Sequence, residues 1–239
     1  MKKVSLLSYT SIFMLAIGTY ANAGLFISEV VDATLPGGNP KFVEITNSAN
    51  TDYTFTGGGI AIQSNANIDL VIDVDLTGVT ITAGDSFVIQ TTSNDGQNIF
   101  ENTYGFPADL YSPGFFSNGD DRYILATADD GAGTPLATVI ADIHGVLDTD
   151  GSGEPWEYTD GFAYRLPTVT DGNGGVFDIS EWYHSGVNGL ETGDDATELP
   201  LIQAQTTPGT HTFGVPEPST ALLALASIVC LSGTKRLRS

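Results

Sequence analysis

The residues best suited to ion binding form a short acidic loop, Asp148-Thr-Asp-Gly-Ser-Gly153. Asp148, Asp150 and Ser152 supply oxygen atoms at the first, third and fifth positions, and Gly153 follows at the sixth. This pattern is the first half of an EF-hand-type calcium loop, in which alternate residues turn their oxygens inward and glycine allows the sharp bend. The loop therefore predicts a candidate calcium site.

The second half of that calcium pattern is missing. Position twelve is Thr159, where the loop requires a glutamate that binds through both carboxylate oxygens. Glu154, Glu157 or Asp160 would have to take its place, and the alternative is a hydrated acidic turn between strands. Calcium is the one cofactor that the sequence suggests, and a calcium-dependent adhesion or binding module is one alternative function.

Glu29 and Glu44 are the candidates for acid–base chemistry. Glycoside hydrolysis needs two carboxyl groups that flank the scissile bond. Both glutamates lie in strand-like segments, where the alternative is a carboxylate that accepts hydrogen bonds from backbone or loop groups. We therefore predict a protein that is not an enzyme, and we keep a secreted hydrolase as the remaining alternative.

Other residues with chemical potential lack a supporting pattern. The histidines are not spaced as in a zinc protease, and no serine-hydrolase or phosphate-binding glycine motif occurs. Trp156, Trp182 and Tyr183 are expected in the core or at a strand edge, although together on the surface they would offer a platform for a sugar ring. The histidines are His144, His184 and His211.

Short alternating apolar runs, separated by clusters of glycine, asparagine and aspartate, must position these residues. In residues 70–76, for example, Ile72, Val74 and Leu76 alternate with aspartates, which is typical of a half-buried strand. One short helix is expected at 98–104, ending at Gly105. The spacing of the runs predicts an all-β sandwich or barrel. The runs are 25–31, 42–46, 70–76, 85–90, 122–126 and 138–143.

The central region is strongly acidic. Residues 24–214 hold 28 acidic side chains against three basic ones, which gives a net charge of −25. Such a field repels nucleic acid and anionic polysaccharide and attracts cations. We therefore expect no nucleic-acid partner.

The N-terminus has the three parts of a secretory signal peptide. Lys2 and Lys3 precede the apolar stretch 12–18, and Ala21 and Ala23 form a small-x-small cleavage site. We expect cleavage after Ala23, so that residues 1–23 are removed, and a retained anchor is the alternative. The apolar stretch is shorter than a comfortable membrane span.

The C-terminus carries an uncharged apolar run, 219–234, followed by the basic residues Lys235, Arg236 and Arg238. A helix of that run is about 24 Å long, a marginal span that basic side chains extend by reaching the lipid headgroups. Basic flanks favour the cytoplasmic side of a membrane. The run also holds the only cysteine, Cys230, so the domain before it has no thiol or disulfide.

Pro216, Glu217 and Pro218 directly precede this run. The order of Pro-Glu-Pro, hydrophobic helix and short basic end resembles the PEP-CTERM sorting tail over residues 215–239. The resemblance implies transient membrane anchoring and recognition by an exosortase-type membrane protease that removes the tail. It also implies delivery to the cell surface or extracellular matrix of a Gram-negative bacterium. The alternative is an ordinary tail anchor with a proline-rich stem.

The middle of the chain resembles the secreted bacterial form of the lamin-tail domain. The matching pieces occur in the family's order, although residues 144–178 form a longer, more glycine- and acid-rich region. The resemblance implies an immunoglobulin-like β-sandwich over residues 24–214, without enzymatic activity, as a structural or binding module. Extracellular polysaccharide or another matrix component is the expected partner. The pieces are LFISEVV (25–31), KFVEITN (41–47), TAGDSFVI (82–89), NGDDRYILA (118–126), VIADIHGVLDTDG (139–151), WEYTDGFAYRLP (156–167) and ISEWYHS (179–185).

Overall fold

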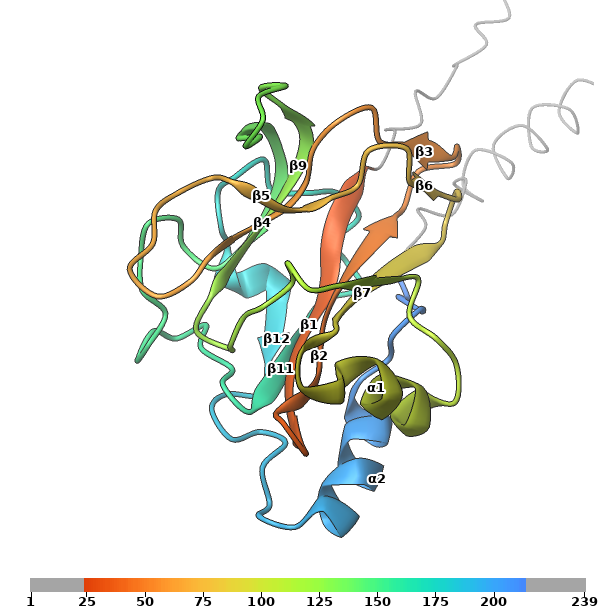
Figure 1. Cartoon of the computed structure of the whole chain (residues 1–239), viewed down its shortest axis with the longest axis vertical. Coiled ribbons are helices and arrows are strands. Elements are labelled where there is room, and N and C mark those ends of the chain that lie inside the picture. Colours follow the sequence, from red (N-terminus) through yellow and green to blue (C-terminus); the bar gives the residue numbers. More distant parts are fainter. Residues whose placement is uncertain (1–23, 214–239) are drawn as a thin grey trace, which may run out of the picture.

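The computed structural model describes residues 24–213, which fold mainly into β-strands (Figure 1). The larger sheet has the strand order β12-β11-β1-β2-β7-β8, and all its neighbours are antiparallel except β7 and β8. Its strands are β1 (Leu25–Leu35), β2 (Asn39–Asn47), β7 (Ser86–Thr91), β8 (Leu110–Ser112), β11 (Gly161–Arg165) and β12 (Trp182–His184).

A smaller antiparallel sheet has the order β10-β9-β4-β5. A separate two-stranded ribbon joins β3 (Tyr53–Thr54) to β6 (Thr80–Ile81). The strands of the smaller sheet are β4 (Gly59–Gln63), β5 (Ile72–Asp75), β9 (Arg122–Asp129) and β10 (Ala137–His144).

The main hydrophobic core lies between these two sheets. Ile27, Val43 and Ile89 of the larger sheet share one buried cluster with Ile60 and Leu125 of the smaller sheet. Alternation along each strand produces this face, because successive side chains point to opposite sides of a sheet. The six apolar runs read from the sequence all fall within or largely overlap strands β1, β2, β5, β7, β9 and β10, which confirms the all-β prediction.

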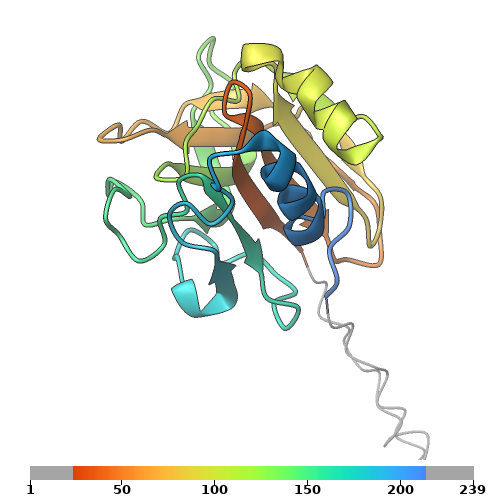
Figure 2. The same ribbon diagram turned by 90° about the horizontal axis from the view of Figure 1, so that it is seen from below.

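Two helices cover the other face of the larger sheet. They are α1 (Gly96–Tyr104) and α2 (Asp195–Gln205), and Figure 2 shows them side by side across β1, β2 and β7. Phe42 of β2 packs there against Phe100 of α1, with ring centroids 5.8 Å apart. The larger sheet is therefore buried on both faces along much of its length.

Helix α1 confirms the predicted helix and its end, because Gly105 has the left-handed conformation that commonly terminates helices. Helix α2 was not predicted. Its interior contains Pro200, which cannot donate the usual helical hydrogen bond, and this obscures the helical pattern. At the start of the helix, the Glu198 carboxylate accepts hydrogen bonds from the N–H groups of Thr192 and Gly193, which fixes the turn that leads into it.

A β-bulge in β1 determines the direction in which the Glu29 side chain points. Ile27 lies opposite Ile45 and Glu29 lies opposite Glu44, so Ser28 is the extra residue. A bulge places two consecutive side chains on one side of the strand pair and re-aims those that follow. Ser28 and Glu29 consequently both face Glu44, away from the core.

Groups from distant strands satisfy the backbone at this bulge. The N–H of Ile27 donates to Asp142 of β10 at 2.7 Å, and its carbonyl accepts from the Arg165 guanidinium at 3.4 Å. Arg165 also forms a fully buried ion pair with Asp142 and a second pair with Glu181. This network ties the two sheets together beside the bulge.

Candidate functional site

The feature with the clearest chemical potential is the carboxyl pair of Glu29 and Glu44. The two residues face each other across β1 and β2, and their exposed fractions are 2% and 0%. The Ser28 hydroxyl donates to Glu44 Oε1 at 2.5 Å, and the Thr46 hydroxyl donates to Ser28 Oγ at 2.8 Å. The bulge therefore creates a small polar island on the helix-covered face of the sheet.

The residues that follow α2 cover this pair, and we call residues 206–213 the C-terminal segment. The N–H of Thr207 donates to both Glu29 oxygens at 3.1 Å, and the N–H of Gly209 donates to Glu44 Oε2 at 2.7 Å. The glutamates thus have the backbone-bonded arrangement, which was one of the two sequence-based interpretations. Their access to solvent is closed by the chain itself.

The C-terminal segment is held at both of its ends. The Thr206 and Tyr104 hydroxyls are 2.7 Å apart, which links the start of the segment to α1. Farther along, the His211 ring packs edge-on against Phe26, with centroids 5.5 Å apart. The segment therefore runs from the Glu29 region toward the beginning of β1, and the two ends of the described chain lie at the same end of the domain.

Burial makes both carboxyl groups unusually weak acids. Desolvation is the largest cause, and it raises the pKa of Glu44 from 4.5 to about 7. The pKa of Glu29 is raised well above its ordinary value by desolvation and then by the nearby Glu44 charge. Within the described residues, the ion pairs of lysine and arginine involve other carboxylates, namely Asp32, Asp142 and Glu181.

The raised pKa values favour a protonated pair near neutral pH, and the pair is covered rather than open as in a catalytic centre. A hydrolase would need both carboxyls beside a substrate bond, whereas here the backbone of Thr207 and Gly209 occupies that side. Sequence reasoning found the glutamates but missed Ser28, Thr207 and Gly209. None of these carries a motif, because two of the three contribute backbone N–H groups.

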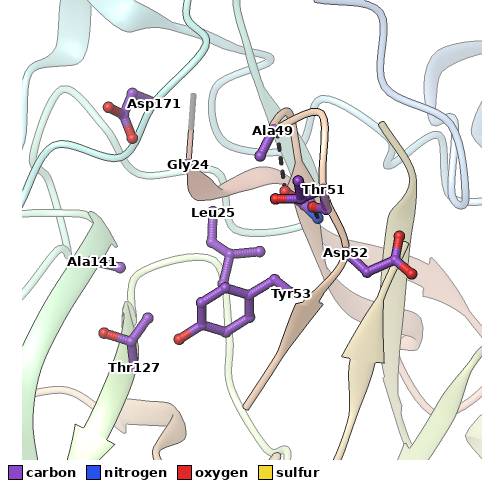
Figure 3. Close-up of a pocket in the computed structure, with 10 residues that line it drawn as sticks. Gly24, Leu25, Ala49, Thr51, Asp52, Tyr53, Thr127, Ala141 and Asp171 are labelled. Carbon is purple, nitrogen blue, oxygen red and sulfur yellow. Dashed lines mark hydrogen bonds between the residues drawn. The ribbon is translucent and has the colours of Figure 1, made fainter. Parts of the chain in front are cut away.

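An open pocket of about 350 Å³ lies where β1 begins (Figure 3). Leu25 and Tyr53 form its apolar part, and Asp52 and Asp171 stand at opposite sides of it. A Cβ atom on Gly24 would lie 2.5 Å from Asp171 Oδ1, so a larger residue there would require the exposed Asp171 side chain to move. No residue of this pocket was predicted as a site.

The candidate calcium loop spreads its oxygens over separate partners. Asp148 exchanges two 3.0 Å hydrogen bonds with Gln63, and the Ser152 hydroxyl donates to Asp120 at 2.8 Å. Asp150 accepts from the backbone N–H of Ser152 at 3.1 Å. Glu154 is exposed. Among residues 24–213, no three histidine, cysteine, aspartate or glutamate side chains converge as ligands for a metal ion.

Two of the histidines form a pair that links the sheets. Nε2 of His144 in β10 lies 3.2 Å from Nε2 of His184 in β12. Burial lowers the pKa of His144 well below 6.5 and that of His184 to about 4, so both are neutral near pH 7. His144 also contacts the rings of Trp156 and Trp182, with centroids 5.9 and 4.6 Å away.

The three aromatics that could form a sugar platform do not come to the surface together. Trp156 and Trp182 are 2% and 6% exposed and belong to the interior, whereas Tyr183 is 44% exposed. Tyr183 instead stacks on Tyr164, with centroids 4.9 Å apart. The predicted positions in the core or at a strand edge are therefore confirmed, and the alternative of a three-residue platform is wrong, because alternation on β12 points Trp182 inward and Tyr183 outward.

The predicted processing signals lie outside the described residues. Among residues 24–213, no helix has both the length and the apolar character needed to cross a bilayer. The comparisons find no protein family, curated protein or solved structure that matches this chain. The signals outside are Ala21 and Ala23 of the cleavage site, Pro216, Glu217 and Pro218, and Lys235, Arg236 and Arg238.

Proposed function

We propose that residues 24–214 form the mature, non-catalytic module of an exported protein, and that the ends of the chain are processing signals. In this proposal a signal peptidase removes residues 1–23. An exosortase-type protease then recognises Pro216, Glu217 and Pro218 and removes the tail. The module finally resides at the cell surface or in the extracellular matrix of a Gram-negative bacterium. The proposed fold type is an immunoglobulin-like sandwich, consistent with two sheets that share one core.

The observation that carries this proposal is the course of the C-terminal segment. By covering Glu29 and Glu44, it occupies the side on which a substrate of a carboxylate-dependent hydrolase would have to bind. His211 of this segment contacts Phe26, so the C-terminal end of the described chain lies next to its N-terminal end. Both ends of the described chain thus lie at one pole of the domain, so the segments that flank it can face the same membrane surface.

The acidic composition agrees with an extracellular role as a binding or structural module. A net charge of −25 over residues 24–214 keeps such a module soluble and away from polyanions. It leaves uncharged polymers and cations as the ligands that the field does not repel.

Intact-mass spectrometry of the protein from fractions of its own cells tests the proposal. We expect surface or extracellular material that starts at Gly24 and lacks residues 219–239. A variant with Pro216, Glu217 and Pro218 replaced by alanine should stay in the membrane fraction with its tail attached. Cytosolic protein that keeps both Met1 and Ser239 would refute the proposal.

A further inference from the structure

The helix-covered face of the larger sheet ends in a pair of nearly parallel aromatic rings, of which Tyr183 is exposed and Tyr164 is partly buried. Tyr164 of β11 and Tyr183 of β12 are direct cross-strand neighbours, and their ring planes are inclined by 20°. Phe162 supports them from the interior, 5.8 Å from the Tyr183 ring. Because β12 ends the strand order of this sheet, Tyr183 stands at the sheet's edge. The pair is therefore a rigid, flat surface that reaches solvent.

A groove of about 350 Å³ is lined by Tyr164, the ring on which Tyr183 stacks. Tyr164 forms one part of its wall, and the end of α2 and the C-terminal segment form the other part. The segment contributes alcohol and imidazole groups, and α2 contributes an amide. These polar residues are Gln205, Thr207, Thr210, His211 and Thr212.

The lining of this groove differs in charge from the rest of the domain. Among the described residues that line it, none is acidic, although residues 24–214 carry 28 acidic side chains. The one basic residue, Arg165, is fully buried and its guanidinium is committed to Asp142 and Glu181. Burial also lowers the pKa of His211 to about 4, so its imidazole is neutral near pH 7.

We propose that this groove, together with Tyr183, binds an uncharged polysaccharide. Sugar rings combine C–H faces, which pack on aromatic rings, with hydroxyl groups that pair with alcohol, amide and imidazole groups. The groove is open to solvent rather than closed, which suits a polymer that continues beyond it. Its volume lies at the lower end of the range for small-molecule sites, enough for one or two sugar units.

The charge of the domain selects against the competing ligands. Anionic polysaccharides and nucleic acids carry their charge along the whole chain and are repelled by a net charge of −25. An uncharged polymer meets no such repulsion. This inference deepens the proposed function, because it names the class of matrix component that the module binds.

Native electrophoresis of the purified full chain through gels that contain a polysaccharide tests this inference. The probes are dextran, galactomannan and xyloglucan as neutral polymers and alginate as an anionic one. We expect retardation by at least one neutral polymer and none by alginate. Tyr183→Ala should weaken the apparent affinity roughly five- to tenfold, because it removes one ring from the stack. Tyr183→Phe should keep most of the affinity.

Two further variants separate binding from folding. Phe116→Ala removes another exposed ring, 56% exposed, that does not line the groove, and it should bind as wild type does. Thr210→Val removes a groove hydroxyl and should weaken binding, with an unchanged melting temperature as the control for folding. The inference is overturned if no neutral polymer retards the chain, if alginate retards it more, or if Tyr183→Ala has no effect.

The outcome is independent of the processing experiment. Correctly trimmed surface protein that binds none of the neutral polymers would refute the polysaccharide site alone. Tyr183-dependent binding by the purified chain, together with cytosolic native protein that keeps both Met1 and Ser239, would refute the sorting proposal alone.

Discussion

Replacement of Glu44 by glutamine should make the domain more stable at neutral and alkaline pH. Glu44 has a pKa of about 7 in the folded chain and about 4.5 when unfolded. Between these values the folded state binds more protons than the unfolded state, so the free energy of unfolding falls as pH rises. Glutamine cannot ionise, and therefore the variant does not lose this contribution.

The size of the effect follows from the pKa difference. At about 1.4 kcal/mol per pH unit, displacement from 4.5 to about 7 corresponds to about 3 kcal/mol. The unfolding free energy of Glu44→Gln, relative to wild type, should therefore rise by about 3 kcal/mol between pH 4.5 and pH 8. Removal of the Glu44 charge also relieves Glu29, which adds to the change in the same direction.

Urea unfolding at a series of pH values, followed by fluorescence of the buried Trp156 and Trp182, measures this difference. The pair of buried histidines, His144 and His184, titrates in the opposite sense. Their lowered pKa values remove stability as pH falls below about 6.5, but this contribution is common to both proteins and cancels. The exposed Glu191→Gln change is the matched control and should give a curve parallel to wild type.

A difference between Glu44→Gln and wild type that stays constant from pH 4.5 to pH 8 would refute this reasoning. It would mean that water reaches the Glu44 carboxyl in the folded state, and that the C-terminal segment does not exclude it. A difference that shrinks with rising pH would show that the ionised carboxylate is stabilised by its hydrogen bonds to Ser28 and Gly209.

Three further outcomes follow from the same structure. Hydrogen exchange, corrected for intrinsic rates, should show less protection of the C-terminal segment at pH 8 than at pH 5 in wild type, because ionisation of Glu44 favours an uncovered carboxyl. Glu44→Gln should show no such difference in protection. Equal pH dependence in both proteins would contradict this. Arg165→Leu should destabilise the chain by about 3–5 kcal/mol in urea, because it leaves Asp142 buried without its cation, and adding Asp142→Leu should recover part of the loss. Millimolar calcium should raise the melting temperature no more than magnesium does, because the oxygens of Asp148 and Ser152 already have protein partners. A calcium-specific rise in melting temperature that Asp148→Asn abolishes would instead establish the calcium site.

Much of the architecture follows from local patterns in the sequence. Alternation of apolar and polar residues, as in Ile72 and Val74, identifies strands because the side chains of a strand point alternately to its two faces. Gly105 marks the end of α1 because glycine adopts the left-handed conformation without a steric penalty. The acidic charge of the domain and the absence of cysteine before Cys230 are properties of composition alone.

The orientation of individual functional groups required the tertiary structure. Alternation from Leu25 and Ile27 would place Glu29 in the core, and the bulge at Ser28 moves it to the opposite face. Beside the bulge, the N–H of Ile27 is accepted by Asp142, which is 115 residues away in the chain. No local pattern encodes such a partner.

The same limit applies to the surfaces that we propose to be functional. The hydrogen bonds that cover the glutamates come from backbone N–H groups, which every residue except proline possesses, so the residue types at 207 and 209 do not predict them. The stack of Tyr164 on Tyr183 depends on the register between β11 and β12. The sequence determines which residues can form strands and turns and which carry charge. Only the folded chain determines which of these residues come into contact.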